Sequence, residues 1–348
     1  MAFSLCLWIM LFPMSAGAES VRYEAEDGRV TFAADVYGSE FIEVAVLNAS
    51  NMFVADQDEV ASIVFGHADY TSGIVYGNPQ FTYDSNMLRI LQNSDIYFST
   101  KDSDDLVELV NQNDEPYCRG QLPLYEMAFL SQQAAKDAAI TLMDSLGLDC
   151  QVQAMYSINR TKYNANYDEA VELNKEWTGG DWGVMALPTR AEWPHEDISY
   201  VLFLQQQHDG IPLYRYTYQS LGSDLYTSGT NINMSYGRDG LMRLNVSDPV
   251  KVVDVAEPPI QILRYDEAAK RFADNRNFIL GAFAMDHLVQ RISLEYLPTY
   301  KTWIDGEKTN VPFTLRPAWV FESVELNTPY PTLYHHLVDA ITGDVIGL

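Results

Sequence analysis

The sequence predicts an α+β protein in which antiparallel sheets are each packed by a helix, with a β-rich lobe at the N-terminus. Asp-Gly between alternating segments is a strong hairpin signal, because both residues tolerate positive φ. Such pairs interrupt strand-like sequence at Asp27-Gly28, Asp209-Gly210, Asp239-Gly240 and Asp305-Gly306. The closing segment 334–346 also has the pattern of a hairpin. These hairpins favour antiparallel meanders over a doubly wound parallel sheet. Helical patterns precede the strands in two passages.

Residues 1–18 have the pattern of a signal peptide. Residues 3–14 are apolar, and Ser15-Ala16-Gly17-Ala18 offers a small-residue cleavage site before Glu19. The apolar run is shorter than the roughly 20 residues that span a bilayer. No Lys or Arg precedes it, which leaves open a truncated start or a buried N-terminal element. We expect an exported chain, extracellular or associated with the cell envelope, with no membrane span after processing.

A β-rich N-terminal lobe is predicted over residues 19–115. Within it, 56–65 predicts a helix with acidic residues at its start and apolar residues on one face. Four carboxylates near the end of the lobe could collect around Ca²⁺: Asp102, Asp104, Asp105 and Glu108. The EF-hand glycine at the sixth position is absent. We therefore favour a solvated acidic connector.

A lobe of one helix plus an antiparallel sheet is predicted over residues 116–256. The helix is expected over 124–147, where apolar positions recur near a 3.5-residue spacing. A strand follows at 151–158, then the hairpins at the second and third Asp-Gly pairs. Cys118 and Cys150 flank the helix, and the sequence leaves open whether they are bridged.

The C-terminal lobe is predicted over residues 257–348. Pro258-Pro259 is a plausible joint. A helix begins near Asp266, where acidic residues lie at the positive end of the helix dipole. Strands are expected at 292–297 and around Trp319, followed by the closing hairpin at Thr342-Gly343.

Several of these pieces, in this order, resemble PepSY-like domains. They are Asp266-Glu267-Ala268-Ala269, the Asp209-Gly210-Ile211-Pro212-Leu213 turn and the terminal segment 338–346. Arg316-Pro317-Ala318-Trp319 is similar to YycI/YycH-type envelope regulators, and the layout resembles an uncharacterised family of exported proteins from Gram-positive bacteria. The resemblance covers the last two-thirds of the chain. It implies PepSY/YycI-like lobes that bind or restrain a partner without chemistry of their own.

Composition limits the functional classes. With 48 acidic against 22 basic residues, the net charge of −26 argues against binding to nucleic acid or an anionic membrane. The sequence contains no nucleophile elbow, zinc-protease motif, P-loop or Cys-x-x-Cys pair. His335 and His336 are adjacent, so on a strand they point to opposite faces and cannot easily share a metal ion. We expect no enzyme activity, no cofactor and no metal.

One long loop holds the candidate contact residues, which are aromatic or titratable: Trp177, Trp182, Glu192, Trp193 and His195. Tryptophan faces beside carboxylates suit a sugar ring or a peptide. The structural alternative, which we favour, is that the rings pin the loop onto the sheet.

Two functions remain open. The first is an exported, non-enzymatic binding or regulatory protein of the cell envelope, whose unknown protein or peptide partner uses sheet edges and the tryptophan loop. The alternative is a carbohydrate-binding or glycan-hydrolysing protein centred on the segment from Trp177 to Trp193. Clustered, exposed tryptophans beside convergent carboxylates would favour the alternative.

Overall fold

The chain is seen here as a computed structural model. It describes residues 19–24, 30–52, 56–67, 69–91, 95–103, 122–177, 192–216, 219–220, 226–227, 229–280, 286–299, 312–326 and 333–346. Among these residues, no helix has both the length and the apolar content needed to cross a membrane.

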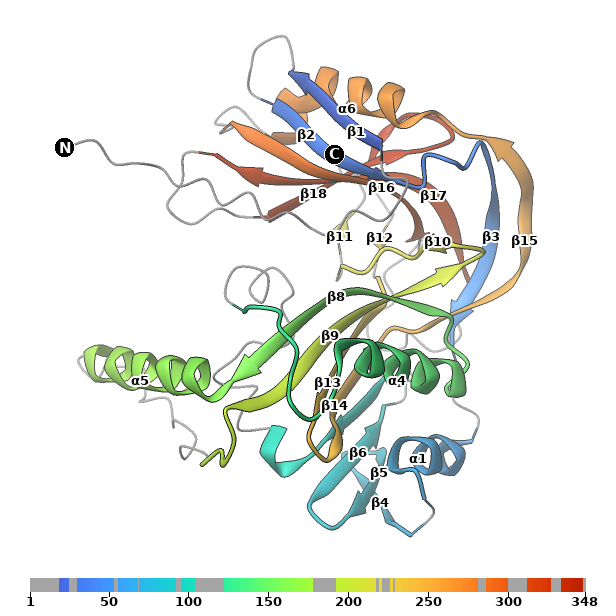
Figure 1. Cartoon of the computed structure of the whole chain (residues 1–348). Helices are drawn as coiled ribbons and strands as arrows, with labels where there is room; N and C mark the ends of the chain where they lie inside the picture. The colour runs from blue at the N-terminus through green and yellow to red at the C-terminus, as the bar shows by residue number, and fades with distance from the viewer. Residues whose placement is uncertain are drawn as a thin grey trace, which may run out of the picture. The chain divides into compact units, whose positions relative to one another are not determined.

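The fold is β-rich, so the predicted α+β fold of helix-packed sheets is wrong. Strands account for 54% and helices for only 21% of the structure. The strands form a mixed eight-stranded sheet, an antiparallel nine-stranded sheet and a small ribbon of β11 (Gln219–Ser220) and β12 (Tyr226–Thr227). The prediction failed because strands distant in the sequence pair with each other: β2 lies beside β16, and β7 lies beside β14 (Figure 1). Local patterns identify strands but not their partners.

Two compact units make up the chain, and each combines separate stretches of sequence. The first contains Met1–Ala45, Pro258–Glu295 and Pro317–Leu348, and the second contains Val46–Glu257 and Tyr296–Arg316. The division into lobes over residues 19–115, 116–256 and 257–348 stays a prediction.

The eight-stranded sheet follows the order β1-β2-β16-β17-β18-β19, with β3 pairing both β15 and β17. β16 runs parallel to β2, whereas β18 runs antiparallel to β17. The strands are β1 (Glu19–Glu24), β2 (Val30–Tyr37), β3 (Glu43–Asn51), β15 (Val250–Gln261), β16 (His287–Thr299), β17 (Phe313–Glu325), β18 (Leu333–Asp339) and β19 (Val345–Ile346).

Helix α6 (Tyr265–Leu280) lies against this sheet within the first unit. Phe272 of the helix stacks on Phe321 of β17 at 5.1 Å between ring centroids and meets Phe32 of β2 edge-on at 6.0 Å. Trp319 Nε1 donates a hydrogen bond of 2.8 Å to the Leu263 carbonyl, just before the helix. Aromatic residues from three segments therefore form the core of this unit.

The nine-stranded sheet has the order β10-β9-β13-β14-β7-β6-β5-β4, with β8 also pairing β9. All of its pairs are antiparallel. The strands are β4 (Thr71–Val75), β5 (Asn78–Tyr83), β6 (Asn86–Ile90), β7 (Ile96–Ser99), β8 (Cys150–Asn159), β9 (Asp197–His208), β10 (Ile211–Pro212), β13 (Asn231–Gly237) and β14 (Gly240–Ser247).

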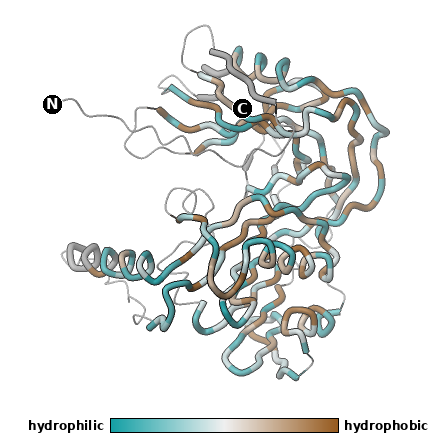
Figure 2. The backbone as a smooth tube through the Cα atoms, in the orientation of Figure 1, coloured by the Kyte–Doolittle hydropathy of each residue, from teal (hydrophilic) through white to brown (hydrophobic). Residues whose placement is uncertain are grey.

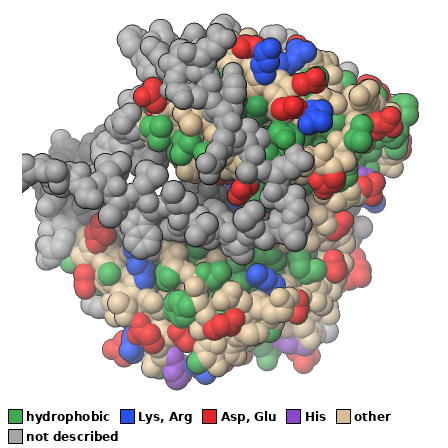
Figure 3. Space-filling view, turned by 45° about the horizontal axis from the view of Figure 1, so that its top comes forward, with side chains coloured by type: hydrophobic (Ala, Val, Ile, Leu, Met, Phe, Trp, Pro, Cys, Tyr) green, Lys and Arg blue, Asp and Glu red, His purple; other side chains and the backbone are tan. Residues whose placement is uncertain are grey.

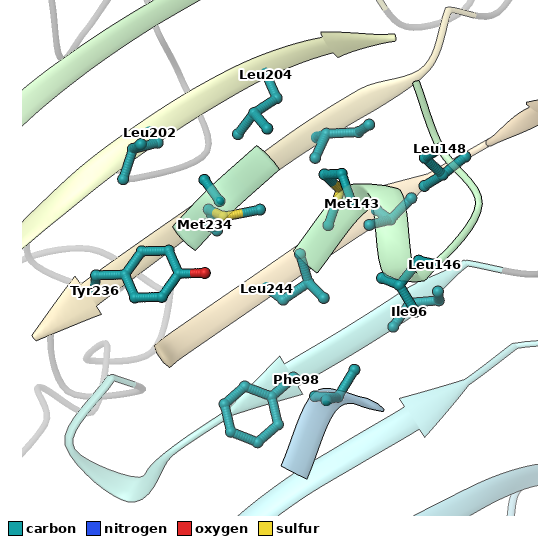
Figure 4. Close-up of a cluster of buried hydrophobic side chains, with 14 of the residues drawn as sticks. Ile96, Phe98, Met143, Leu146, Leu148, Leu202, Leu204, Met234, Tyr236 and Leu244 are labelled. Carbon is teal, nitrogen blue, oxygen red and sulfur yellow. The ribbon is translucent and has the colours of Figure 1, made fainter. Parts of the chain in front are cut away.

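Strand β9 is the centre of the second unit because both of its faces are buried. Its residues Tyr200, Leu202 and Leu204 pack in the larger core cluster, and Val201 and Phe203 pack in a second cluster on the other face. Figure 4 shows Leu202 and Leu204 beside Met143, Met234 and other buried side chains of the larger cluster. This explains the nearly continuous apolar run of the strand.

The helices of this unit include α1 (Gln57–Phe65), α4 (Gln132–Ser145) and α5 (Arg160–Trp177). Helix α1 begins where Asp56 accepts a hydrogen bond from Glu59 N and ends at Gly66, whose φ is +74°. Helix α4 is capped by Ser131 and buries Ala135, Ala139 and Met143. The described part of α5 is mainly hydrophilic (Figure 2).

Candidate functional site

A buried polar cluster lies on three neighbouring strands of the first unit. Ser323 Oγ of β17 is 3.3 Å from His287 Nδ1 of β16 and 3.0 Å from His336 Nε2 of β18. A serine hydroxyl can donate its one proton and accept another. With both imidazoles neutral, Ser323 can thus donate to one ring and accept from the other.

Burial keeps these two histidines neutral. Desolvation lowers the pKa of His336 to about 3, and the nearby His287 and His335 add to the shift. Desolvation also lowers the pKa of His287, although Glu325 and Asp286 act in the opposite direction. Charging either ring therefore opposes folding.

Serine and histidine are residues of nucleophilic catalysis, but this cluster lacks access. Ser323 is 0% exposed and His287 is 3% exposed. His336 stacks on Phe272 at 4.8 Å between ring centroids. A substrate cannot reach a hydroxyl that has no exposed surface, so the cluster acts as part of the core.

His335 and His336 point to opposite faces of the sheet, as the strand pattern predicts. His335 Nε2 lies 3.7 Å from Glu322 Oε2, and these two side chains are 11% and 6% exposed. His336 instead faces Ser323 and Phe272. Among the described residues, no group of three or more His, Cys, Asp and Glu side chains could hold a metal ion.

In the second unit, Trp193 is the predicted contact residue with the best-defined surroundings. Its ring is half-buried and meets the fully buried ring of Tyr163 edge-on, with centroids 5.9 Å apart. It packs against the cluster that contains Phe203. The indole Nε1 is buried and has no acceptor among the described residues. The ring thus attaches the segment before β9 to helix α5 and the sheet.

Carboxylates next to Trp193 stabilise local structure. Glu196 accepts hydrogen bonds from the Thr161 amide and hydroxyl at the start of α5, and it lies 3.3 Å from Arg160. The Thr161 hydrogen bonds and the Arg160 charge lower the Glu196 pKa. Asp197 Oδ2 accepts from the Ala128 amide at 3.0 Å. Each carboxylate therefore holds the segment around Trp193 to a neighbouring backbone amide.

Trp177, another predicted contact residue, lies apart from Trp193. Trp177 ends α5, so its Cα lies about 21 Å along the helix axis from Tyr163, at 1.5 Å for each of fourteen residues. Glu192 and His195 are exposed. Trp182 lies outside the described residues. The structure therefore does not bring Trp177 and Trp193 together, and it leaves the position of Trp182 as a prediction.

Two other sequence features are only partly described. Asp102 is exposed, whereas Asp104, Asp105 and Glu108 of the acidic connector lie outside the described residues. Cys118 also lies outside them. Cys150 is a buried, free thiol, so it makes no disulfide here.

Exposed apolar side chains occur at the edges of sheets, where the sequence had not singled out residues. β4 pairs only with β5 among the described strands, and Ile74 on it is 77% exposed. Tyr76, in the following turn, is 95% exposed at a φ of +52°. Within the described part of the chain, β15 pairs only with β3, and its Val253 and Val255 are 61% and 58% exposed. The spacing of two strand-like runs around Tyr76-Gly77 is a signal that could have located the first edge.

Comparison with known proteins shows a shared fold and no family. No protein-family model matches the chain, and no curated protein matches it. Among solved structures, an uncharacterised protein from Eubacterium rectale ATCC 33656 is similar, with a TM-score of 0.63 and 14% sequence identity. The match covers 91% of this chain and 90% of that chain. At this identity the likeness shows the fold alone.

Proposed function

We propose that this protein is an exported, non-enzymatic binding or regulatory protein of the cell envelope. The observation that carries the proposal is the exposure of apolar side chains on strands at sheet edges, at Ile74 and Tyr76 on one edge and at Val253 and Val255 on another. A sheet edge offers unpaired backbone groups and alternating side chains to an extended partner. Exposed apolar residues next to such groups add binding surface.

The environment of the titratable groups supports binding over catalysis. Ser323, His287 and His336 are enclosed in the core. Glu196 and Asp197 are hydrogen-bonded to the start of α5 and to Ala128. The packing of Trp193 against Tyr163 also favours attachment of the loop over a sugar platform. These groups are thus committed to holding the fold.

Export and a regulatory role rest on the sequence. Residues 3–14 followed by Ser15-Ala16-Gly17-Ala18 have the signal-peptide pattern. The resemblance of the terminal segment to PepSY-like and YycI/YycH-type proteins supports partner binding without chemistry. Mass spectrometry of the exported chain should find Glu19 as its first residue; an intact Met1 in that fraction would contradict export by cleavage at this site.

The partner can be sought with the chain from Glu19 to Leu348 immobilised and exposed to an envelope extract. We expect one protein to be retained in stoichiometric amount and to be released by competing free chain. A heat-unfolded bait is the matched control, because it has the same charge and composition without the sheet edges.

A second assay distinguishes the proposed binding function from the alternative, a glycan-hydrolysing protein. The same purified chain is incubated with cell-wall glycans, and soluble fragments are measured by chromatography. The proposal expects no cleavage. Glycan hydrolysis that is lost in a Glu192→Gln variant would replace it with the carbohydrate-active alternative.

A further inference from the structure

The two outer edges of the nine-stranded sheet differ in how they are protected. At the β8 edge, the Ser157 amide donates to the Pro123 carbonyl at 2.7 Å, and the Tyr125 amide donates to Ser157 Oγ at 3.1 Å. The segment before α4 thus covers that edge. At the other end of the sheet (Figure 1), β4 pairs only with β5 among the described strands. Residues 71–74 are all exposed.

The sequence of β4 lacks the usual protection of an edge. Natural sheet edges carry charges or prolines that discourage pairing with another strand. The exposed strand β15 follows this rule, with Lys251, Asp254, Glu257 and the pair Pro258-Pro259. β4 reads Thr-Ser-Gly-Ile-Val and has neither a charge nor a proline. Of these two exposed edges, β4 is the one able to accept a further strand.

The register of the hairpin identifies the free backbone groups. A two-residue turn, Tyr76-Gly77, makes Val75 and Asn78 a hydrogen-bonded pair. Because bonded and non-bonded pairs alternate, Ile74 and Ser72 belong to non-bonded pairs, opposite Pro79 and Phe81. Residues in such pairs direct their N–H and C=O groups away from the partner strand. Ser72 and Ile74 therefore offer two donors and two acceptors at the free edge.

The side chains at this edge add an apolar contact. Ile74 is 77% exposed and Tyr76 is 95% exposed. Tyr76 has a φ of +52°, a left-handed conformation in which a bulky residue is uncommon. Asn, Asp or Gly would fit this turn with less strain. An aromatic ring kept exposed in a strained position is consistent with a role in contact.

The charges around β4 indicate which kind of partner strand its free edge would attract. Asp69 precedes the strand, Asp84 lies in the next turn, and the Tyr70 hydroxyl bonds the carbonyl and carboxylate of Asp58. Acidic side chains are also scattered over the face of the molecule seen in Figure 3, and the chain carries −26 overall. A second copy would bring the same charge to the same edge and be repelled. A basic segment would be attracted.

We propose that β4 is the docking edge for an extended, basic polypeptide segment of another protein, which adds to the sheet by bonding Ser72 and Ile74 and packs an apolar side chain against Ile74 and Tyr76. This inference rests on the proposed binding function and names its site and the chemistry of its partner. The test must distinguish binding of such a segment from pairing of β4 with a second copy of this chain.

The test uses a display library of random peptides about ten residues long, enough to span an edge strand. The whole chain is the target. We expect enrichment of peptides with net positive charge and alternating apolar residues. Acidic enriched peptides, or no enrichment, would overturn the inference. Self-association measured by sedimentation, without peptide binding, would assign the edge to a second copy and would overturn it too.

Variants of the edge locate the binding. Ser72→Pro removes an outward N–H without removing a β4–β5 hydrogen bond, and Ile74→Lys adds a repelling charge. For one enriched peptide, each variant should raise Kd by a factor of about ten or more, about 1.4 kcal/mol. Ile42→Lys, at a residue that is 69% exposed and lies just before β3, makes the same change away from β4 and β15. It is the matched control and should leave Kd unchanged. Circular dichroism checks folding; if Ser72→Pro fails to fold, Ile74→Lys still decides.

The outcomes separate this inference from the proposed function. If the envelope partner is retained by wild-type bait and equally by Ile74→Lys bait, the binding function stands and β4 is not its site. If no partner is retained and the library also yields nothing, both fail.

Discussion

At the scale of single residues, the structure shows how serine and histidine side chains are accommodated in the core of the first unit. Ser323 bridges His287 and His336 at hydrogen-bonding distance, yet it has no exposed surface. In a buried environment these polar atoms act as hydrogen-bond partners for one another. No local sequence signal marks this cluster, because its three members come from three strands.

Stability should fall as pH drops below 6.5, because His336 stays neutral in the folded chain down to a pKa of about 3. The unfolded chain binds a proton near pH 6.5 and the folded chain does not, so the contribution is present above 6.5 and is lost below it. Between pH 7 and pH 5 the loss is about 2 kcal/mol. Urea unfolding at both pH values measures it.

The His336→Gln variant is the control, because a glutamine amide can bond Ser323 but does not titrate. Its free energy of unfolding should fall by about 2 kcal/mol less than that of the wild type over the same pH range. An equal fall in both proteins would show that His336 is not the group responsible.

Cys150 should be unreactive while the protein is folded. Burial raises its thiol pKa to about 12, and Asp149 and Asp144 add to the shift. The thiolate is the reactive form, so iodoacetamide at pH 8 should leave Cys150 unlabelled until the chain is unfolded in guanidinium. Peptide mapping by mass spectrometry distinguishes it from the other cysteines. Rapid labelling of the folded chain, or a peptide containing a Cys118–Cys150 bridge, would contradict this environment.

At the scale of elements, local signals succeeded where capping and turn chemistry decide the structure. The helix expected over 56–65 is α1, with Asp56 as its cap and Gly66 after its end. The Asp209-Gly210 turn joins β9 to β10, with φ of +51° and +79°. The helix expected over 124–147 begins only at Gln132, after the Ser131 cap. Residues before it cover the edge of β8, a long-range role that periodicity cannot reveal.

The β4–β5 turn should become more stable when its aromatic residue is replaced. Asn tolerates a φ of +52° better than Tyr, so Tyr76→Asn should raise the free energy of unfolding by about 0.5–1 kcal/mol. The same change should weaken binding of the basic peptide, because the ring is lost. Tyr76→Phe keeps the ring and the strain, and should change neither quantity. A Tyr76→Asn protein that is less stable than the wild type would show that the ring supports the fold.

At the scale of the whole molecule, the sequence identified strands but not their arrangement. Segments 151–158, 292–297 and the Trp319 strand all lie within observed strands. The parallel pairing of β16 with β2 could not be read locally, since it joins residues more than 250 positions apart. Helix α5 was missed because its pattern is mainly hydrophilic.

The candidate site was harder to anticipate than the strands. The composition of the tryptophan loop predicted a contact site. In the structure, Trp193 packs on Tyr163, and Trp177 lies far along α5. The exposed edge at Ile74 and Tyr76 depends on which strand ends the sheet. That property belongs to the assembled sheet and not to any segment.

Hydrogen exchange resolved to single amides tests the central claim, binding at the β4 edge, most directly. In the free chain, the Ser72 and Ile74 amides should exchange fast and those of Gly73 and Val75 slowly, since the latter pair within the hairpin. Adding the enriched basic peptide should slow Ser72 and Ile74 at least tenfold. Protection confined to β15 or to the segment around Trp193, with Ser72 and Ile74 unchanged, would contradict it.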